Sequence, residues 1–280
     1  REMIAKAASE KPVTKKALAK EAGVSISSLY YQPKQPAKDW FLKQQIETVL
    51  SEHHSYGHKR IALELGVNKK RVLRVMKLFG LKPYRRRPEK PKKPRDTGMA
   101  NPFPNLLQLI PFPRLPNIAW VSDFTHLKWH GKWVYLATIM DIYDRKIVGW
   151  SVLTSHTVEL TIKALIDAVE KQGLSQILHS DQGSEYKSRV YTKFVASLGI
   201  RQSMSKKASP WENGYQESFY SGFKVDFGDS DRYKTLGELT AAIYLQIHYY
   251  NTKRIHGKLK MPPQAYLERQ QLTNLIPIRS

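Results

Sequence analysis

The hydrophobic pattern of this chain changes its period near residue 117. From there to residue 153 apolar side chains recur at every second position, which is typical of half-buried strands. The pattern predicts strands over 118–127, 133–140 and 146–153, a helix over 157–172, a strand over 176–180, a helix over 187–198, a short strand over 200–203, and helices over 210–226 and 236–250. Three antiparallel strands followed by a helix and a parallel strand predict an α/β fold around a mixed five-stranded sheet.

Residues 12–32 have helical spacing and predict two short helices that are separated at Gly23. The small Ala19, the turn residue Gly23 and the apolar Leu29 together resemble a helix-turn-helix, and a plain helical hairpin is the alternative. The residues of its second helix that we expect to face DNA are Ser27 and Ser28.

A second helical segment follows Pro36. It predicts a helix from Asp39 to about His53, a helix over 58–65, and a helix over 69–79 that Asn68 caps. One face of the last helix is apolar and the rest is basic, so this helix either lies along DNA phosphates or presents a solvated surface. DNA is favoured, and the expected contacts are Lys69, Lys70, Arg71 and Arg74.

Basic residues and proline dominate the next stretch, which predicts an extended linker. Between Lys82 and Arg95, eight of fourteen residues are basic and four are proline. The linker is either a solubilising spacer or a strap that neutralises phosphates, and the strap is favoured, with Arg85, Arg86 and Arg87 as contacts. The chain is therefore divided into a helix-turn-helix over 1–36, a second helical DNA-binding segment over 37–81, the linker over 82–116, the α/β core over 117–270 and a tail over 271–280.

The charge balance supports a polyanionic partner. The chain has 46 basic and 24 acidic residues and a net charge of +22. Nucleic acid is favoured over a membrane surface, because no run approaches the roughly 18 apolar residues of a spanning helix and no signal-peptide pattern is present. The absence of cysteine excludes disulfides, thiolate catalysis and cysteine-ligated zinc, and is consistent with a reducing compartment.

Three carboxylates are the candidate catalytic residues. On the helix over 210–226, Glu217 points away from an apolar stripe, and Lys224 follows two turns later on the same face. One carboxylate alone holds a divalent metal poorly. Asp123 lies within a predicted strand, and Asp181 directly follows another. There are 57 residues between Asp123 and Asp181, and 35 residues between Asp181 and Glu217. Such oxygen ligands suit Mg²⁺ or Mn²⁺.

This pattern resembles a known family. The run Trp-Val-Ser-Asp-Phe-Thr-His around Asp123, the run His-Ser-Asp-Gln-Gly-Ser-Glu-Tyr around Asp181, and Glu217 after its 35-residue gap are similar to the D,D(35)E catalytic core of retroviral integrases and bacterial insertion-sequence transposases. The segments 213–219 and 250–256 resemble insertion-sequence family three most closely, in its second-reading-frame type. The resemblance implies a ribonuclease-H-like core in which Asp123, Asp181 and Glu217 are catalytic and hold two Mg²⁺ or Mn²⁺ ions.

The resemblance also implies a function. The protein is expected to be a transposase that binds the terminal inverted repeats of its element and target DNA as a homo-oligomer, at least a dimer, in the bacterial cytoplasm at the nucleoid. Metal-dependent strand cleavage would be followed by transfer of the 3′-hydroxyl. Further DNA contacts are expected at Lys224, Lys206 and Lys207. The alternatives are a DNA-binding regulator with a non-catalytic core, and a ribonuclease-H-type nuclease.

Other polar residues have simpler interpretations. Glu185 follows Asp181 too closely to bring in a distant element, and Asp141 and Asp144 flank a turn, where aspartate is common. Packing or support of the metal ligands is expected of His126 and His179. Packing of the last helix explains Asn251, Arg254 and His256 as well as any chemistry does.

Overall fold

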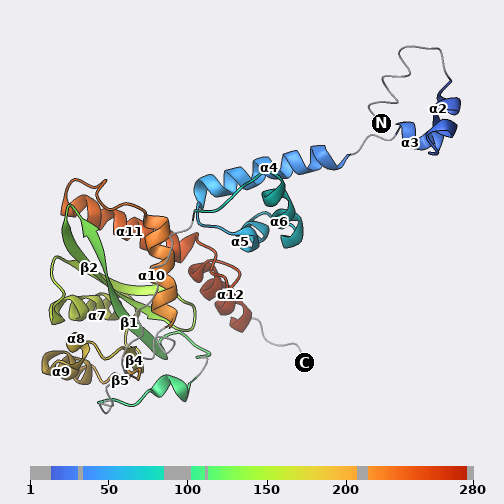
Figure 1. Ribbon diagram of the computed structural model, residues 1–280. Helices are drawn as coiled ribbons and strands as arrows, with labels where there is room; N and C mark the ends of the chain where they lie inside the picture. Colours follow the sequence, from blue (N-terminus) through green and yellow to red (C-terminus); the bar gives the residue numbers. More distant parts are fainter. Residues whose placement is uncertain (1–13, 31–33, 85–101, 111–112, 207–213, 276–280) are drawn as a thin grey trace, which may run out of the picture.

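The structure is a computed structural model, and it describes residues 14–30, 34–84, 102–110, 113–206 and 214–275. Figure 1 shows an α/β core, a helical arm made of helices α4 to α6 beside it, and the small α2–α3 pair at the far end of the arm. No helix of the described residues has the length and apolar character needed to cross a membrane.

The core contains the expected five-stranded sheet. Its strands are β1 (Ala119–Trp129), β2 (Lys132–Asp141), β3 (Ile147–Leu153), β4 (Ile177–Ser180) and β5 (Arg201–Met204). They lie in the order β3-β2-β1-β4-β5. The pairs β1–β2 and β2–β3 are antiparallel, whereas β1–β4 and β4–β5 are parallel. The mixed sheet of the α/β prediction is therefore confirmed.

Helices cover both faces of this sheet, because side chains alternate between the two faces along each strand. Trp120 belongs to the apolar cluster shared with α7 (Val158–Gln172), α8 (Ser184–Lys187) and α9 (Arg189–Ser197). Its neighbours Ala119 and Val121 belong to the cluster shared with α10 (Gly214–Phe227) and α11 (Leu236–Thr252). On the first face Gly149 lets α7 approach closely, since a Cβ there would lie 2.4 Å from the carbonyl oxygen of Ala164.

The helical arm has its own apolar core. Its helices are α4 (Gln35–Glu52), α5 (His58–Glu64) and α6 (Lys69–Leu78). Their buried residues join one cluster with Ile255, which follows α11, so the arm is packed onto the core. The contact is also polar: the Tyr56 hydroxyl accepts the backbone N–H of Ile255 at 2.6 Å. At the far end, α2 (Lys15–Glu21) and α3 (Ile26–Tyr30) are separated at Gly23, whose φ of 63° suits glycine.

Several elements differ from the sequence predictions. Helix α4 begins at Gln35 rather than at Asp39, because Pro36 occupies its first turn, where proline is tolerated. The helix expected over 187–198 is two helices, since Ser188 is extended and caps α9 by accepting the N–H of Tyr191. The late part of the expected linker packs on the core: η1 (Leu106–Gln108) is tied to Ser203, whose hydroxyl accepts the N–H of Leu106.

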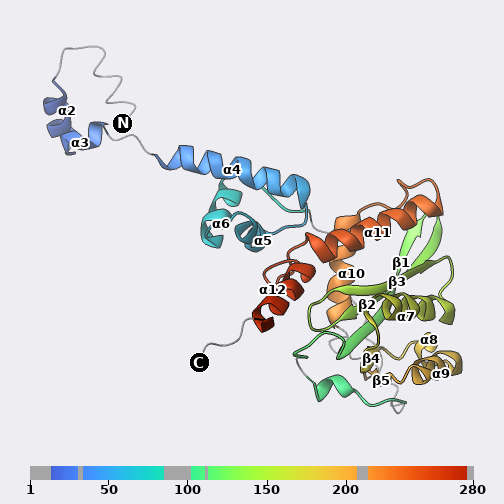
Figure 2. The same ribbon diagram turned by 180° about the vertical axis from the view of Figure 1, so that it is seen from behind.

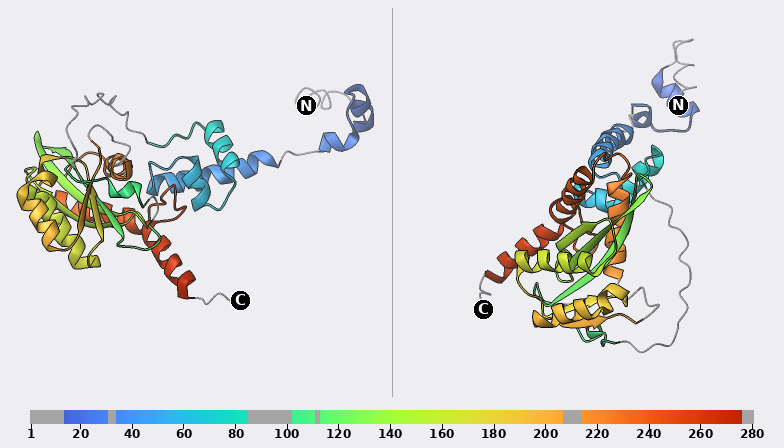
Figure 3. Two further views of the ribbon diagram at one scale, coloured as in Figure 1. Left: turned by 90° about the horizontal axis from the view of Figure 1, so that it is seen from below. Right: turned by 90° about the vertical axis from the view of Figure 1, so that its left-hand side faces the viewer.

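A last helix, α12 (Pro263–Leu275), was not expected, and the predicted boundary at residue 270 falls inside it. Figures 2 and 3 show that α12 leaves the end of α11 and points away from the sheet. The linker residues 85–101 and the start of the expected helix over 210–226 lie outside the described residues.

Candidate active site

Two of the three carboxylates stand on neighbouring strands. Asp123 lies in β1, and Asp181 directly follows Ser180, the last residue of β4. The parallel register ends with Val121 opposite His179, and Asp123 and Asp181 each follow this pair by two residues. Adjacent strands are about 4.8 Å apart, so the two carboxylates lie close together on two interior strands, at the C-terminal end of β4.

Helix α10 brings the third carboxylate to this place. The buried Gln216 donates from Nε2 to the carbonyl oxygens of Val121 (2.7 Å) and Thr138 (3.1 Å), and the Thr138 hydroxyl donates back to Gln216 Oε1 at 2.9 Å. One turn later the Tyr220 hydroxyl donates to the backbone carbonyl of Asp123 at 2.7 Å. These bonds fix the register of α10 against β1, and they leave Glu217 exposed beside the strand that carries Asp123.

The other two acidic groups influence Asp123. Burial raises the pKa of Asp123, the negative charges of Asp181 and Glu217 raise it further, and the result is about 8 despite the N–H of Phe124 and the charge of Lys224. Burial also raises the pKa of Asp181, against a hydrogen bond that the N–H of Gly183 donates at 2.9 Å. Burial is therefore the main reason that both pKa values are raised, and at Asp123 the neighbouring negative charges add to it.

The donor set suits a divalent metal without forming a closed cage. Among the described residues, no three side chains of ligand type stand close enough to enclose an ion. Mg²⁺ does not require such a cage, because it keeps several waters and is bound through one or two carboxylates together with substrate phosphates. A cation would also relieve the repulsion that raises the pKa of Asp123.

Sequence reasoning set aside a fourth carboxylate that lies beside the site. A Cβ on Gly183 would stand 3.1 Å from Asp181 Oδ1 and 3.2 Å from Glu185 Oε2, so the two acids flank this glycine. Burial favours protonation of Glu185, but the hydrogen bond to His156 (2.9 Å) and bonds from its own backbone and Ser184 outweigh burial and lower its pKa. Helix α8 begins at Ser184, so the chain turns there and Glu185 lies near Asp181. In the sequence, a helix start at Ser184 is the one feature that could have predicted this proximity.

The expected DNA contacts in the core and linker fall into three groups. Lys224 lies on the same side of α10 as Glu217 and lowers the pKa of Asp123. Lys206 is exposed just beyond β5. Lys207, Arg85, Arg86 and Arg87 lie outside the described residues.

In the helical arm the expected contacts have different environments. Lys69, Lys70 and Arg71 are exposed on α6. Arg74 instead forms two hydrogen bonds, of 2.7 and 2.5 Å, with the buried carboxylate of Asp39, so its guanidinium joins α6 to α4. The side chains expected to face DNA from α3, Ser27 and Ser28, both lie within hydrogen-bond distance of the Ser25 hydroxyl.

The polar residues with simpler interpretations are mostly structural. Asp141 accepts the N–H groups of Tyr143 and Asn117, as a turn residue does. The side chain of Asn251 pairs with the backbone of Ile147 in both directions, at 2.9 Å each. Arg254 donates from Nε to Asp226 on α10 at 2.5 Å. His179 is buried, with Nδ1 2.8 Å from the Ser203 hydroxyl.

Comparison with known proteins identifies the class. Two family models, both described as integrase core domain, match residues 113–210 and 198–263. The fold is similar to that of a chain in the simian T-cell lymphotropic virus intasome solved with PP2A regulatory subunit B56 gamma, with a TM-score of 0.51, 17% identity, and coverage of 83% of this chain and 77% of that chain. The protein is therefore an enzyme of the polynucleotidyl transferase type with a ribonuclease-H-like integrase core.

Relatives define the family more closely. The chain is 35% identical over 237 residues to the transposase for insertion sequence element IS904 of Lactococcus lactis subsp. lactis, covering 81% of this chain and 92% of the relative. It is 30% identical over 254 residues to the putative transposase InsK for IS150 of Escherichia coli (87% and 89%), and 30% over 210 residues to InsF for IS3A of the same species (72% and 73%). The chain belongs to the insertion-sequence transposases with an integrase core, the family of IS3. Its function is that of a transposase, and the regulator and nuclease alternatives are not favoured.

Proposed function

We propose that this transposase binds the terminal inverted repeats of its own insertion sequence, cleaves one strand with the help of divalent metal, and transfers the resulting 3′-hydroxyl to target DNA. The observation that carries the proposal is the convergence of Asp123, Asp181 and Glu217 from two strands and a helix. Burial first, and then the negative charges of Asp181 and Glu217, raise the pKa of Asp123 to about 8, which supports a site that takes up cations.

The three carboxylates would hold one or two Mg²⁺ or Mn²⁺ ions. When bound, such ions activate an attacking water or hydroxyl and stabilise the leaving oxygen in an in-line displacement. The chain's own residues orient the ligands: Gln216 and Tyr220 fix α10 against β1, and the N–H of Gly183 holds Asp181. The DNA supplies the hydroxyl that attacks, so the chain needs no covalent intermediate.

A DNA path leads away from the carboxylates along the same side of α10. Lys224 lines a cavity of about 500 Å³ together with His126, Lys128 and Trp133, and in the described residues this cavity has one acidic neighbour, Asp229. Cations and an aromatic ring in series suit a phosphodiester strand near its reacting end.

The remaining basic residues would hold the rest of the DNA. We propose that the segments 1–36 and 37–81 dock on the inverted repeats through Ser27, Ser28, Lys69, Lys70 and Arg71, and that linker residues 85–87 together with Lys206 and Lys207 neutralise further phosphates. Arg74 contributes by keeping α6 in place. Joining two ends requires two ends held together, so the active form is at least a dimer that acts on DNA of the bacterial nucleoid.

The test is a cleavage assay on a duplex that carries the end of the element encoding this chain. With Mg²⁺, the wild-type protein is expected to cleave one strand, and Asp123→Asn is expected to bind the duplex without cleaving it. Glu159→Gln is the matched control, since this exposed acid on α7 pairs only with Lys163 in the described structure. Loss of DNA binding in Asp123→Asn, or cleavage at the wild-type rate, contradicts the proposal.

A further inference from the structure

A second polar site lies on another face of helix α10. Two cavities, of about 550 and 520 Å³, share Tyr215, Ser218, His256 and Lys258 as wall residues and therefore form one continuous groove. It follows α10 from Gly214 to Val225, a length of about 16 Å at 1.5 Å per residue. Neither Glu217 nor Lys224 lines it.

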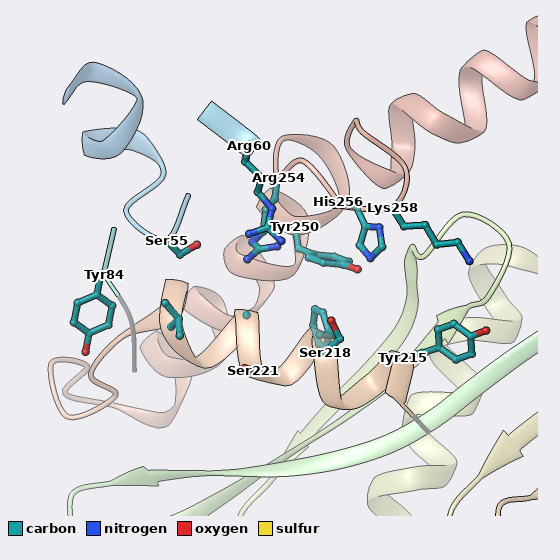
Figure 4. A pocket seen from close by; sticks show the side chains of 14 residues that line it. Ser55, Arg60, Tyr84, Tyr215, Ser218, Ser221, Tyr250, Arg254, His256 and Lys258 are labelled. Carbon is teal, nitrogen blue, oxygen red and sulfur yellow. The ribbon is translucent and has the colours of Figure 1, made fainter. Parts of the chain in front are cut away.

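The groove, which we call the cationic groove, is defined by five side chains: Arg60, Arg145, Arg254, His256 and Lys258. Figure 4 shows Arg60 of the helical arm next to Arg254 above α10, with His256 and Lys258 further along and Ser218 and Ser221 below. No acidic side chain is among the described residues that line either cavity.

The cations of the groove are mutually repulsive. Burial lowers the pKa of Arg60, and the charge of Arg254 lowers it further. Burial and then the charges of Arg145, Arg60 and Arg254 lower the pKa of His256 to about 4, so its ring is neutral at pH 7. Two contacts moderate this repulsion: Asp226 binds Arg254, and the ring of Tyr215 lies 4.1 Å from the Arg145 guanidinium carbon.

Unpartnered polar atoms point to a ligand. In the described part of the chain, seven buried side-chain atoms have no hydrogen-bond partner, and four of them belong to residues lining the groove: Ser55 Oγ, Arg60 Nε, Arg145 Nη1 and His256 Nδ1. Arg145 is only 4% exposed. A buried polar group without a partner costs about 1–3 kcal/mol, and Arg60 Nε and Arg145 Nη1 can only donate, so these two positively charged groups favour a ligand that supplies hydrogen-bond acceptors and negative charge.

We propose that the cationic groove binds phosphate groups of a DNA strand, on the face of α10 adjacent to the one that carries Glu217. The phosphates of a strand offer acceptor oxygens to the unpartnered nitrogens of Arg60 in one cavity and Arg145 in the other, and each phosphate adds one negative charge. A single inorganic phosphate would occupy one cavity, whereas a strand that rises about 3.4 Å per nucleotide would follow the whole groove. The exposed hydroxyls of Ser218 and Ser221 are further donors along it.

The inference rests on the proposed function in one respect, because its ligand is the DNA on which the transposase acts. It adds that DNA contacts the seam between arm and core. Arg60 comes from α5 and Arg254 follows α11, so a bound strand would bridge the two parts of the chain and fix their relative position.

The experiment measures DNA affinity at several NaCl concentrations, in the absence of Mg²⁺, for the wild-type chain, Arg60→Gln and Lys193→Gln. Lys193 is an exposed residue of α9 on the opposite face of the sheet, so it is the charge-matched control. Arg60→Gln is expected to weaken binding about tenfold and to lower the salt slope by about 0.9, the value for one lost phosphate contact. Lys193→Gln is expected to leave the slope unchanged.

A methylphosphonate scan identifies the phosphate. Neutralising a single phosphate is expected to weaken binding of the wild-type chain at one position, and to have no further effect there in Arg60→Gln. If every neutralised position weakens Arg60→Gln as much as the wild type, the proposal is wrong. If inorganic phosphate raises the Tm of the wild type but not of Arg60→Gln while the scan shows no coupling, the groove takes a free anion and the DNA assignment is overturned.

Two control measurements accompany the scan. Urea unfolding checks that Arg60→Gln is folded, and Lys258→Gln, an exposed residue of the same groove, repeats the scan if it is not. Cleavage by the wild type with Mg²⁺ is measured separately. If one neutralised phosphate weakens the wild type but not Arg60→Gln and no cleavage is seen, the groove is supported and the proposed chemistry is contradicted. If cleavage is seen and no such phosphate is found, the chemistry is supported and the groove is contradicted.

Discussion

Two faces of helix α10 carry unbalanced charge of opposite sign. On one, Glu217 lies near Asp123 and Asp181, and burial together with the charges of the other two acids raises the pKa of Asp123 to about 8. On the other, the cationic groove leaves buried nitrogens of Arg60 and Arg145 without partners in the described structure. If both proposals are right, one helix separates a face that binds cations from a face that binds anions. Bound DNA would then balance both charges, with divalent metal at the carboxylates and phosphate groups in the cationic groove.

Neighbouring residues on the two faces provide the strongest test. Glu217→Gln is expected to reduce Mg²⁺-dependent cleavage by roughly 10⁴-fold, the scale seen when one member of a catalytic unit is removed, with DNA affinity retained. Ser218→Ala, one residue later on the groove face, is expected to leave cleavage within a few-fold of the wild type. Single-turnover cleavage and DNA titration measure the two effects.

The same two variants can contradict separate functions for the two faces of α10. Glu217→Gln with cleavage within tenfold of the wild type would remove Glu217 from the catalytic group. A loss of cleavage in Ser218→Ala as large as that in Glu217→Gln would show that the two faces are not functionally separate.

The packed face of α10 supports both sites, and Gln216→Leu tests this support. The substitution leaves the carbonyl oxygens of Val121 and Thr138 and the Thr138 hydroxyl without their bonds to Gln216. The Thr138 hydroxyl keeps its contact with the Tyr220 hydroxyl. At about 1–3 kcal/mol for each carbonyl oxygen that loses its bond to Gln216, the free energy of unfolding is expected to fall by about 3 kcal/mol. Urea unfolding measures the loss, and cleavage and the salt slope of DNA binding are expected to fall together.

Tyr220→Phe is the milder control, since it removes a hydroxyl that donates to Asp123 O and keeps the buried ring. A stability of Gln216→Leu equal to that of the wild type would mean that the hydrogen bonds of Gln216 do not set the register of α10.

The core was predictable because its signals are local. Buried and exposed residues alternate only in the second half of β1, and the end of β2 is buried without a break, so apolar runs bounded by turns, rather than strict alternation, placed the first three strands to within a few residues. The placement of Asp123 and Asp181 on adjacent strands follows from one parallel pairing. The strand–helix order that produces this pairing could be deduced from the hydrophobic period.

What was not predicted depends on contacts between distant segments. In the sequence Arg74 does not differ from the other basic residues of α6. In the structure α4 begins at Gln35, and its buried Asp39 accepts a hydrogen bond from Arg74. Helix α12 is mostly polar and has no strong apolar face to mark it. The cationic groove gathers residues near positions 60, 145, 215 and 256, and no spacing in the sequence indicates that they meet.

The dependence of stability on pH and on Mg²⁺ tests the carboxylate group of Asp123, Asp181 and Glu217 by itself. Because the pKa of Asp123 is about 8 in the fold and about 3.9 in an unfolded chain, the folded state binds more protons between these values. The free energy of unfolding of the metal-free protein is therefore expected to fall as pH rises from about 4 to about 8. Asp123→Asn should raise the Tm by a few degrees at pH 8 and hardly at pH 4, as thermal scans can measure.

Mg²⁺ supplies the control. It is expected to raise the Tm of the wild type at pH 8 through binding to the folded state, and to have little effect on Asp123→Asn. Asp144→Asn is the matched variant, since burial and then the charge of Asp141 raise the pKa of Asp144 to about 7 in a turn outside the carboxylate group. This variant should also gain stability at pH 8 but keep the response to Mg²⁺. An equal Mg²⁺ response in Asp123→Asn contradicts a metal site at this residue.

The smallest expected effect concerns Lys224, which lies on the same side of α10 as Glu217. Lys224→Gln should weaken DNA binding about tenfold and lower the salt slope by about 0.9, because one phosphate contact is lost. Cleavage should recover at saturating DNA, since the carboxylates remain. Lys193→Gln is again the control, and equal slopes in both variants would contradict a phosphate contact at Lys224. Combining Lys224→Gln with Arg60→Gln then decides how the faces cooperate: additive losses mean that two strands bind independently, and a smaller combined loss means that one strand passes over both faces of α10.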